Sequence, residues 1–149
     1  MKETVYITIN QAIDTHSRTI DKSGGGEYGQ LDVGRLESVL QNIQNDDYYP
    51  TFVDKLTHLF FCACEFHCFV DGNKRLALSL STLFLILNGY MFIAKDFIIK
   101  FENISYHVAA GKIDKGLLHK ILGAVMDETY DYDESLKLEI LNAISEPEE

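Results

Sequence analysis

Residues 73–87 read NKRLALSLSTLFLIL, and this stretch decides the fold. After a polar first turn it is apolar on nearly every side, which is typical of a helix buried in the centre of a bundle. Asn88 and Gly89 follow it, and a glycine suits the left-handed turn that ends a helix. Its uninterrupted apolar part is about 12 residues long, whereas a helix that spans a bilayer needs about 20. The stretch therefore predicts a buried central helix over Asn73–Leu87 and argues against a membrane protein.

The sequence on both sides predicts further helices around this central one. Apolar residues recur at helical spacing in five other segments, which are 8–20, 32–43, 51–65, 96–110 and 114–126. Residues 131–144 predict a last helix, and Val5–Ile7 suit a short edge strand. A Ser-Gly-Gly-Gly run at 23–26 breaks the first helix and indicates a loop or small hairpin before residue 31. We therefore predict an all-α bundle with at most a short β-hairpin flap.

Composition and charge bound the class of protein. A chain of 149 residues that is 46% hydrophobic and 24% charged is typical of one globular domain. The net charge is −10, and residues 124–149 carry nine acids against one lysine. We therefore predict a domain over residues 1–123 and an acidic, partly helical C-terminal extension over 124–149. Because binding to nucleic acid needs a surplus of lysine and arginine, we expect no direct nucleic-acid binding.

The cysteines and the N-terminus indicate a compartment. Cys62, Cys64 and Cys68 are an odd number in one cluster, which does not make a disulfide framework. The first ten residues show no basic-plus-apolar signal segment. We therefore expect a reducing, cytoplasmic location. A zinc site with His67 lacks a second ligand pair at the usual spacing, so that thiols buried in the core are the favoured interpretation.

The residues that carry chemistry form one run directly before the central helix, His67-Cys68-Phe69-Val70-Asp71-Gly72-Asn73-Lys74-Arg75. A helix N-terminus presents unpaired N–H groups, and a glycine there lets the backbone close around an anion. Lys74 and Arg75 add two cations that suit phosphate. The Asp71 carboxylate makes sense if Mg²⁺ lies between it and the phosphates, and His67 can deprotonate a hydroxyl that attacks a phosphate. Taken singly, the same residues are ordinary turn, cap and solvated-helix residues.

This run resembles the signature of the Fic/Doc superfamily, His-x-Phe-x-Asp/Glu-Gly-Asn, and is most similar to its Doc (death-on-curing) branch. The similarity continues through FLILNGY at residues 84–90, and residues 31–38 and 110–113 also look like family segments. It covers the chain from about Thr8 to Leu122. The resemblance implies a small all-α enzyme, with its catalytic domain in residues 1–123, that transfers part of ATP to a protein hydroxyl with the help of Mg²⁺.

The resemblance also implies a role for each residue of the run. His67 would be the general base on the attacking Ser, Thr or Tyr oxygen, and Asp71 would hold Mg²⁺ on the phosphates. Phe69 would anchor the loop in the core, and Arg75 would bind a phosphate. The anion hole would be formed by Gly72, Asn73 and Lys74.

Two departures from the family pattern bear on the reaction. Many adenylylating members have glycine in place of Lys74 and a second arginine in place of Leu78. That arginine orients the triphosphate so that its α-phosphorus faces the nucleophile, whereas Doc-type kinases bind the nucleotide reversed and transfer the γ-phosphate. We therefore predict a toxin-like protein kinase of a toxin–antitoxin module. The alternatives are a Fic-type protein adenylyl- or nucleotidylyltransferase on the same scaffold, and a catalytically inactive protein that kept the fold for binding or regulation.

The expected partners follow from the same resemblance. The substrate would be a target protein, for which a translation factor is the family's example. Autoinhibited members carry a Ser/Thr-x-x-x-Glu-Gly/Asn helix whose glutamate pairs with the second arginine. This chain has Ser135 and Glu139 at that spacing, but Ile140 follows them and Leu78 replaces the arginine. A Phd-type antitoxin on a separate chain, covering the cleft, is therefore the favoured inhibitor.

Overall fold

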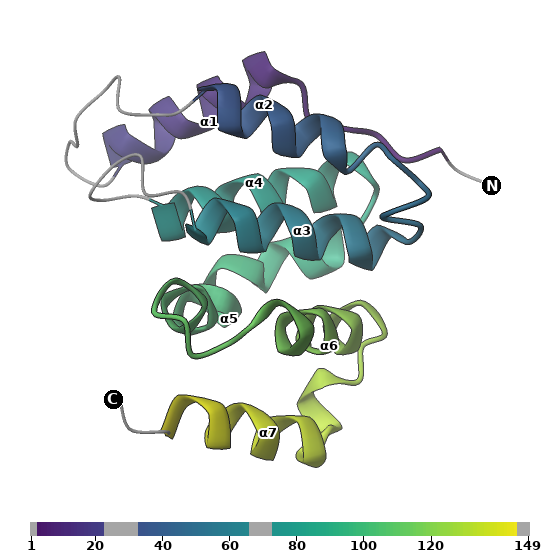
Figure 1. The fold of residues 1–149 in the computed structure, drawn as a ribbon, viewed down its shortest axis with the longest axis vertical. Helices are drawn as coiled ribbons and strands as arrows, with labels where there is room; N and C mark the ends of the chain where they lie inside the picture. The colour runs from purple at the N-terminus through teal and green to yellow at the C-terminus, as the bar shows by residue number, and fades with distance from the viewer. Residues whose placement is uncertain (1–2, 23–32, 66–72, 146–149) are drawn as a thin grey trace.

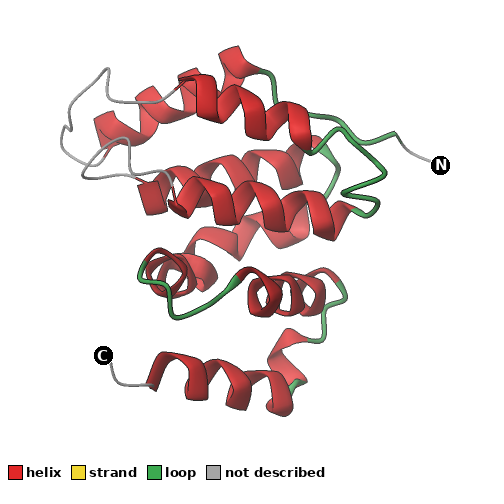
Figure 2. Ribbon diagram, viewed as in Figure 1, coloured by secondary structure: helices red, strands yellow, loops and turns green. Residues whose placement is uncertain are grey.

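The computed structural model describes residues 3–22, 33–65 and 73–145, apart from the side chains of residues 19–22, 73 and 74. Within these ranges the chain forms seven α-helices, one short 3₁₀ helix and no strand. Figure 2 draws the described segments as helices and loops only. The elements are α1 (Ile9–Lys22), α2 (Val33–Asn42), α3 (Phe52–Glu65), α4 (Asn73–Leu87), α5 (Met91–Ala109), α6 (Lys115–Met126), η1 (Tyr130–Tyr132) and α7 (Glu134–Ser145). The predicted all-α fold is confirmed.

The helices stack in layers along the long axis of the molecule (Figure 1). α1 and α2 form one end, α3 and α4 lie next to them, α5 and α6 follow, and α7 forms the other end. α4 contacts α1, α3 and α5, and α3 contacts α2, α4, α5 and α6, so these two helices together form the centre of the bundle. α3 and α4 lie side by side, and the end of α3 at Glu65 precedes the start of α4 at Asn73 by one short connection.

α4 begins and ends at the predicted residues. Leu76, Ala77, Leu80 and Phe84 are fully buried, which explains why the helix is apolar on nearly every side. Gly89 ends it with a φ of 86°, in the region that glycine occupies without strain. The prediction of a buried central helix is therefore confirmed.

The predicted starts of three neighbouring helices are confirmed by their caps. Thr8 and Gln11 exchange hydrogen bonds between side chain and backbone at the start of α1, at 2.9 and 3.1 Å. Thr51 and Asp54 make the same exchange at the start of α3, both at 3.1 Å. The Asp114 carboxylate accepts a hydrogen bond of 2.8 Å from the Leu117 N–H at the start of α6. Each cap satisfies N–H groups that a helix start leaves unpaired.

Two predictions of local structure are wrong. α5 begins at Met91 and not at residue 96, and its N-cap Tyr90 makes no side-chain hydrogen bond, so the sequence carries no cap signal there. Val5–Ile7 form no strand, and the backbone of Val5 is bound by the side chain of Asn88, directly after α4, instead of by a neighbouring strand. The predicted flap, and residue 32 at the start of the predicted helix over 32–43, lie outside the described residues.

The acidic C-terminal segment is helical in part and packs on the bundle. Leu136 and Ile140 of α7 are buried, and Lys120 of α6 lies 3.2 Å from the Glu139 carboxylate. The division of the chain at residue 123 stays a prediction. None of the described helices is both long enough and apolar enough to cross a bilayer.

Candidate active site

The predicted phosphate-binding run joins the end of α3 to the start of α4. His67, Phe69, Asp71 and Gly72 lie outside the described residues. Residues 73 and 74 form the first turn of α4, although their side chains are not described. The described structure thus supplies the helix N-terminus that the predicted anion site needs, and it leaves the roles of these residues as predictions.

Arg75 is the predicted site residue whose surroundings the structure describes. It is exposed on the first turn of α4 and lines a groove of about 700 Å³ between α1, α4 and α5. The groove walls contain residues from all three helices: Gln11, Asp14, Thr15, Arg18, Leu78, Ser79, Thr82, Leu83, Ile86, Ile98, Ile99 and Glu102. A cation in a partly apolar groove suits an anion such as a phosphate.

Leu78 lies in the same groove, one turn after Arg75. Its side chain is only 4% exposed, and the Thr82 hydroxyl donates a hydrogen bond of 2.7 Å to its carbonyl. The position at which many adenylylating relatives place a second arginine is therefore apolar here and faces the groove. Arg75 therefore has no second positive charge beside it at position 78 of α4.

The polar side chains that α1 and α5 add to the groove were not predicted from the sequence. Arg18 and Asp14 form an ion pair of 3.0 Å on α1, and their spacing of four residues was a readable signal. Glu102 on α5 had no such signal, because its place in the groove depends on how α5 packs against α4.

The segment from Ser135 to Glu139, which matches the autoinhibitory motif only in part, lies away from this groove. Glu139 is on α7, where Lys120 of α6 donates hydrogen bonds of 3.2 and 3.3 Å to its carboxylate. The layer of α5 and α6 separates α7 from α4 in Figure 1. The glutamate that would have to reach the start of α4 is thus held on the far side of the bundle.

The cysteines on α3 are free thiols within the described part of the chain. Cys64 is buried in the core, as predicted for its thiol, and Cys62 is half-buried with its sulfur 3.6 Å from a ring nitrogen of His58. Among the described residues no three metal-ligating side chains come together. His67 and Cys68 lie outside the described residues, so the predicted absence of zinc stays a prediction.

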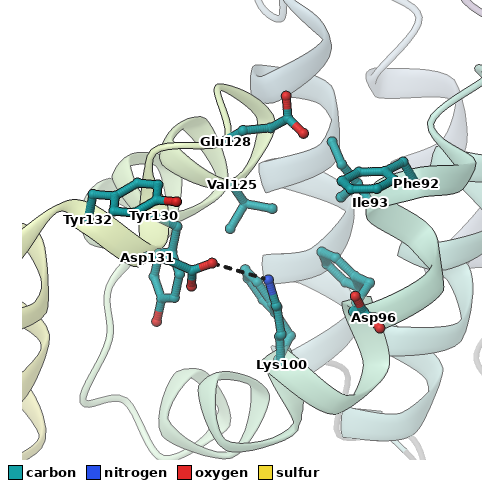
Figure 3. A pocket seen from close by; sticks show the side chains of 11 residues that line it. Phe92, Ile93, Asp96, Lys100, Val125, Glu128, Tyr130, Asp131 and Tyr132 are labelled. Atoms are coloured by element: carbon teal, nitrogen blue, oxygen red, sulfur yellow. Dashed lines mark ion pairs between the residues drawn. The ribbon is translucent and has the colours of Figure 1, made fainter.

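A second, smaller pocket lies between α5, the end of α6 and η1 (Figure 3). It has a volume of about 250 Å³ and aromatic walls that include Phe92, Tyr130 and Tyr132. Lys100 and Asp131 face each other across it at 3.8 Å. This pocket shares no residue with the groove at Arg75, so it is not part of the candidate active site.

The chain is similar to known proteins over its N-terminal and central parts. The model of the Fic/DOC family matches residues 6–85. A relative, Toxin Doc of Mycolicibacterium smegmatis (strain ATCC 700084 / mc(2)155), is 32% identical over 94 residues, which cover 60% of this chain and 72% of the relative. No solved structure matches the chain significantly. The family match extends over more than half of the sequence and includes the predicted phosphate-binding run, and the chain therefore belongs to the Fic/DOC family.

Proposed function

We propose that the protein transfers a phosphate group from ATP to a hydroxyl side chain of a target protein, as the toxin kinase of a toxin–antitoxin module. The support comes from its family, from its similarity to a Doc toxin, and from the groove at the start of α4. The observation that carries the proposal is that Arg75 and Leu78 share this groove, one a cation and the other a buried apolar side chain.

In the proposed reaction, the residues of the run before α4 divide the catalytic and phosphate-binding roles between them. His67 takes the proton of the attacking hydroxyl, and Arg75 holds a phosphate in place by its planar fork of donors. The backbone and side chains of Gly72, Asn73 and Lys74 hold the remaining phosphate oxygens at the helix start. An aspartate oxygen is the ligand type that Mg²⁺ prefers, so Asp71 suits this ion, which when bound neutralises charge on the phosphates. Catalysis then comes from positioning and charge stabilisation.

The apolar side chain at position 78 favours phosphoryl over adenylyl transfer. A second arginine there would bind the far end of the triphosphate and turn the α-phosphorus toward the nucleophile. Because Leu78 offers no charge and is buried, a triphosphate in the groove has Arg75 as its cation from the described part of α4. A terminal phosphate bound at Arg75 would then be the one presented to His67.

The proposed inhibitor is a separate Phd-type antitoxin. The groove is partly apolar and formed by three helices, which suits an amphipathic segment of a partner. The chain's own candidate inhibitory glutamate is held by Lys120 on α6, which leaves the groove to another protein. A kinase of this class needs ATP and a protein target such as a translation factor, and we therefore place its action in the cytoplasm.

The experiment that tests the proposal uses ATP labelled separately at the α- and γ-phosphates. The protein and Mg²⁺ are incubated with each label and with a cell-free translation extract, and the labelled proteins are resolved by electrophoresis. We expect a target labelled from the γ position only, and His67→Ala should lose this labelling while it stays folded. Label from the α position would mean adenylyl transfer, and no label in either reaction would mean an inactive binding protein. Either result would overturn the proposal.

A further inference from the structure

α5 exposes an apolar stripe on the side that faces away from the core. Phe92 is 79% exposed, Ile99 is 80% exposed and Tyr106 is 55% exposed. These residues are seven positions apart, and with 3.6 residues per turn they lie on one line along the helix. The opposite face carries Phe97 and Phe101, which are buried against Phe60 of α3. Because exposed aromatic and branched side chains in a line favour association, the stripe is a candidate interface.

The charges beside the stripe are arranged symmetrically about its centre. Lys95 comes four residues before Ile99 and Glu102 three residues after it. Helical geometry puts both within about 60° of Ile99 and on the same side of the stripe. Asp96 and Asn103 take the equivalent places on the other side. The stripe therefore has two ends of similar shape and flanks that carry complementary groups.

This symmetry fits a second copy of the same helix. If two α5 helices lie antiparallel around a two-fold axis at Ile99, Phe92 of one copy lies opposite Tyr106 of the other. Lys95 then lies within one residue rise, about 1.5 Å along the axis, of the level of Glu102 in the second copy. The axis repeats the contact, so each interface contains two such ion pairs. No like charges meet directly in this register.

The balance of charges on α5 favours a second α5 helix as the binding partner over a strongly charged protein. The chain as a whole carries −10, which would keep two copies apart. α5 itself carries two lysines and two acids, so the stripe is an electrically neutral part of an acidic molecule. A basic partner would find no excess of acids here, whereas a second α5 places a Glu102 beside each Lys95.

We propose that the protein forms a homodimer through antiparallel packing of two α5 helices around Ile99. This inference does not depend on the proposed phosphoryl transfer, because the stripe lies outside the predicted phosphate-binding run. One copy's Ile98, Ile99 and Glu102 border the groove at Arg75, so the second copy would close the outer edge of that groove.

Sedimentation equilibrium of the full chain over a range of concentrations tests the dimer. We expect a mass that rises toward twice the 16.9 kDa of one chain. Ile99→Asp should give a monomer throughout, because it puts a charge at the centre of the apolar contact. The substituted side chain is exposed, so circular dichroism and thermal unfolding should show an intact fold.

Charge exchange tests the register. Lys95→Glu and Glu102→Lys should each raise the dissociation constant about tenfold, because two pairs become two repulsions. The double variant restores both pairs and should return to within about threefold of the original constant. Lys120→Glu is the matched control, because it makes the same change of charge on α6, where Lys120 faces Glu139 of α7 and not the stripe, and it should leave the constant unchanged.

Two results would overturn the proposal. If the measured mass were that of one chain at every concentration, the stripe would not be a homodimer interface and would bind a different protein. A dimer that resists Ile99→Asp, or whose single charge variants are not rescued by the double variant, would place the interface elsewhere.

Discussion

The Asn88 side chain holds the backbone of Val5 from both sides. Its Oδ1 accepts a hydrogen bond of 2.8 Å from the Val5 N–H, and its Nδ2 donates one of 2.9 Å to the Val5 carbonyl. The same Nδ2 donates to the Phe84 carbonyl at 2.8 Å. One amide thus ties the N-terminal segment to the end of α4, so that Ile7 is buried and α1 begins against the central helix.

Asn88→Ala should therefore lower the free energy of unfolding by about 1–3 kcal/mol, because three hydrogen bonds are lost, two of them to the exposed backbone of Val5 and one to the part-buried Phe84 carbonyl. Asn88→Asp should cost at least as much, since a carboxylate cannot donate and its charge is unfavourable at a helix C-terminus. Urea unfolding measures both. Asn142→Ala, on the exposed side of α7, should stay within about 0.5 kcal/mol of the original protein. A harmless Asn88→Ala would contradict this account of the N-terminal segment.

The same contact shows what the sequence did and did not predict about the fold. The centre of the bundle was readable, because α4 is apolar on every side and Gly89 marks its end. The segment at Val5–Ile7 has strand-like residues, but its hydrogen-bond partner is a side chain 83 positions away, which no local pattern records. The start of α5 was predicted wrongly for a related reason. Tyr90 makes no capping hydrogen bond with its side chain, and its ring packs instead on that of Phe52, with 4.9 Å between the ring centroids.

Lys55 offers a prediction about a buried charge. The side chain is 3% exposed, and its Nζ donates to the Ile43 carbonyl and to the Asp46 carboxylate, each at 2.7 Å. Burial lowers its pKa, but the interactions with Asp46 and Tyr6 outweigh burial and hold the pKa above its usual value. Lys55→Met should lower the free energy of unfolding by about 1–3 kcal/mol, because the Ile43 carbonyl loses its donor.

The Asp46 end of this contact is open to solvent and should matter less. Asp46→Ala should cost about 1 kcal/mol, because water can replace an exposed carboxylate. After Lys55→Met the second substitution should cost almost nothing further, and urea unfolding of all four proteins gives this coupling. Independent, additive effects would show that the two side chains do not depend on each other.

His58 predicts an acid-sensitive contact between α3 and α6. Burial, and then the charge of Lys115, lower its pKa from 6.5 to about 4. Lys115 donates a hydrogen bond of 2.8 Å to its Nδ1, and the Tyr49 hydroxyl and Cys62 sulfur also face the ring. The unfolded chain binds a proton near pH 6.5 and the folded one only near pH 4. The contribution to stability is therefore present above pH 6.5 and is lost as the pH falls toward 4.

Urea unfolding at pH 7 and pH 5 measures this effect. The original protein should lose more stability between the two pH values than His58→Gln does, since glutamine does not titrate. Lys115→Gln should lie between them, because without the ammonium charge only burial lowers the pKa of His58. Equal losses in the original protein and in His58→Gln would mean that other groups cause the pH dependence.

Only the part of the candidate site that is formed by consecutive residues could be predicted from the sequence. The run before α4 could be read because its residues are contiguous and a helix start has a known chemistry. The groove could not be read, because Arg18, Leu78 and Glu102 meet through the packing of three helices. The burial of Lys55 could not be predicted either, because a buried lysine needs hydrogen-bond acceptors, and the fold alone shows that the Ile43 carbonyl and the Asp46 carboxylate supply them.

Two arginines of one groove give the sharpest test of the proposed phosphoryl transfer. Arg75→Ala should lower kcat/KM for γ-phosphate transfer by about 10²–10³-fold, as the loss of one donor to a developing charge usually does. The kcat/KM of Arg75→Lys should lie between those of the original protein and Arg75→Ala, because lysine keeps the charge and lacks the planar fork of donors.

Arg18→Ala is the matched control in the same groove. Arg18 is exposed on α1 and its guanidinium is already paired with Asp14 at 3.0 Å, so its loss should change kcat/KM by less than about tenfold. Rates measured with γ-labelled ATP, together with thermal unfolding of each variant, separate a lost contact from a lost fold. If both alanine variants lost activity equally, the groove would act as a general basic surface, and Arg75 would have no special place beside the phosphate.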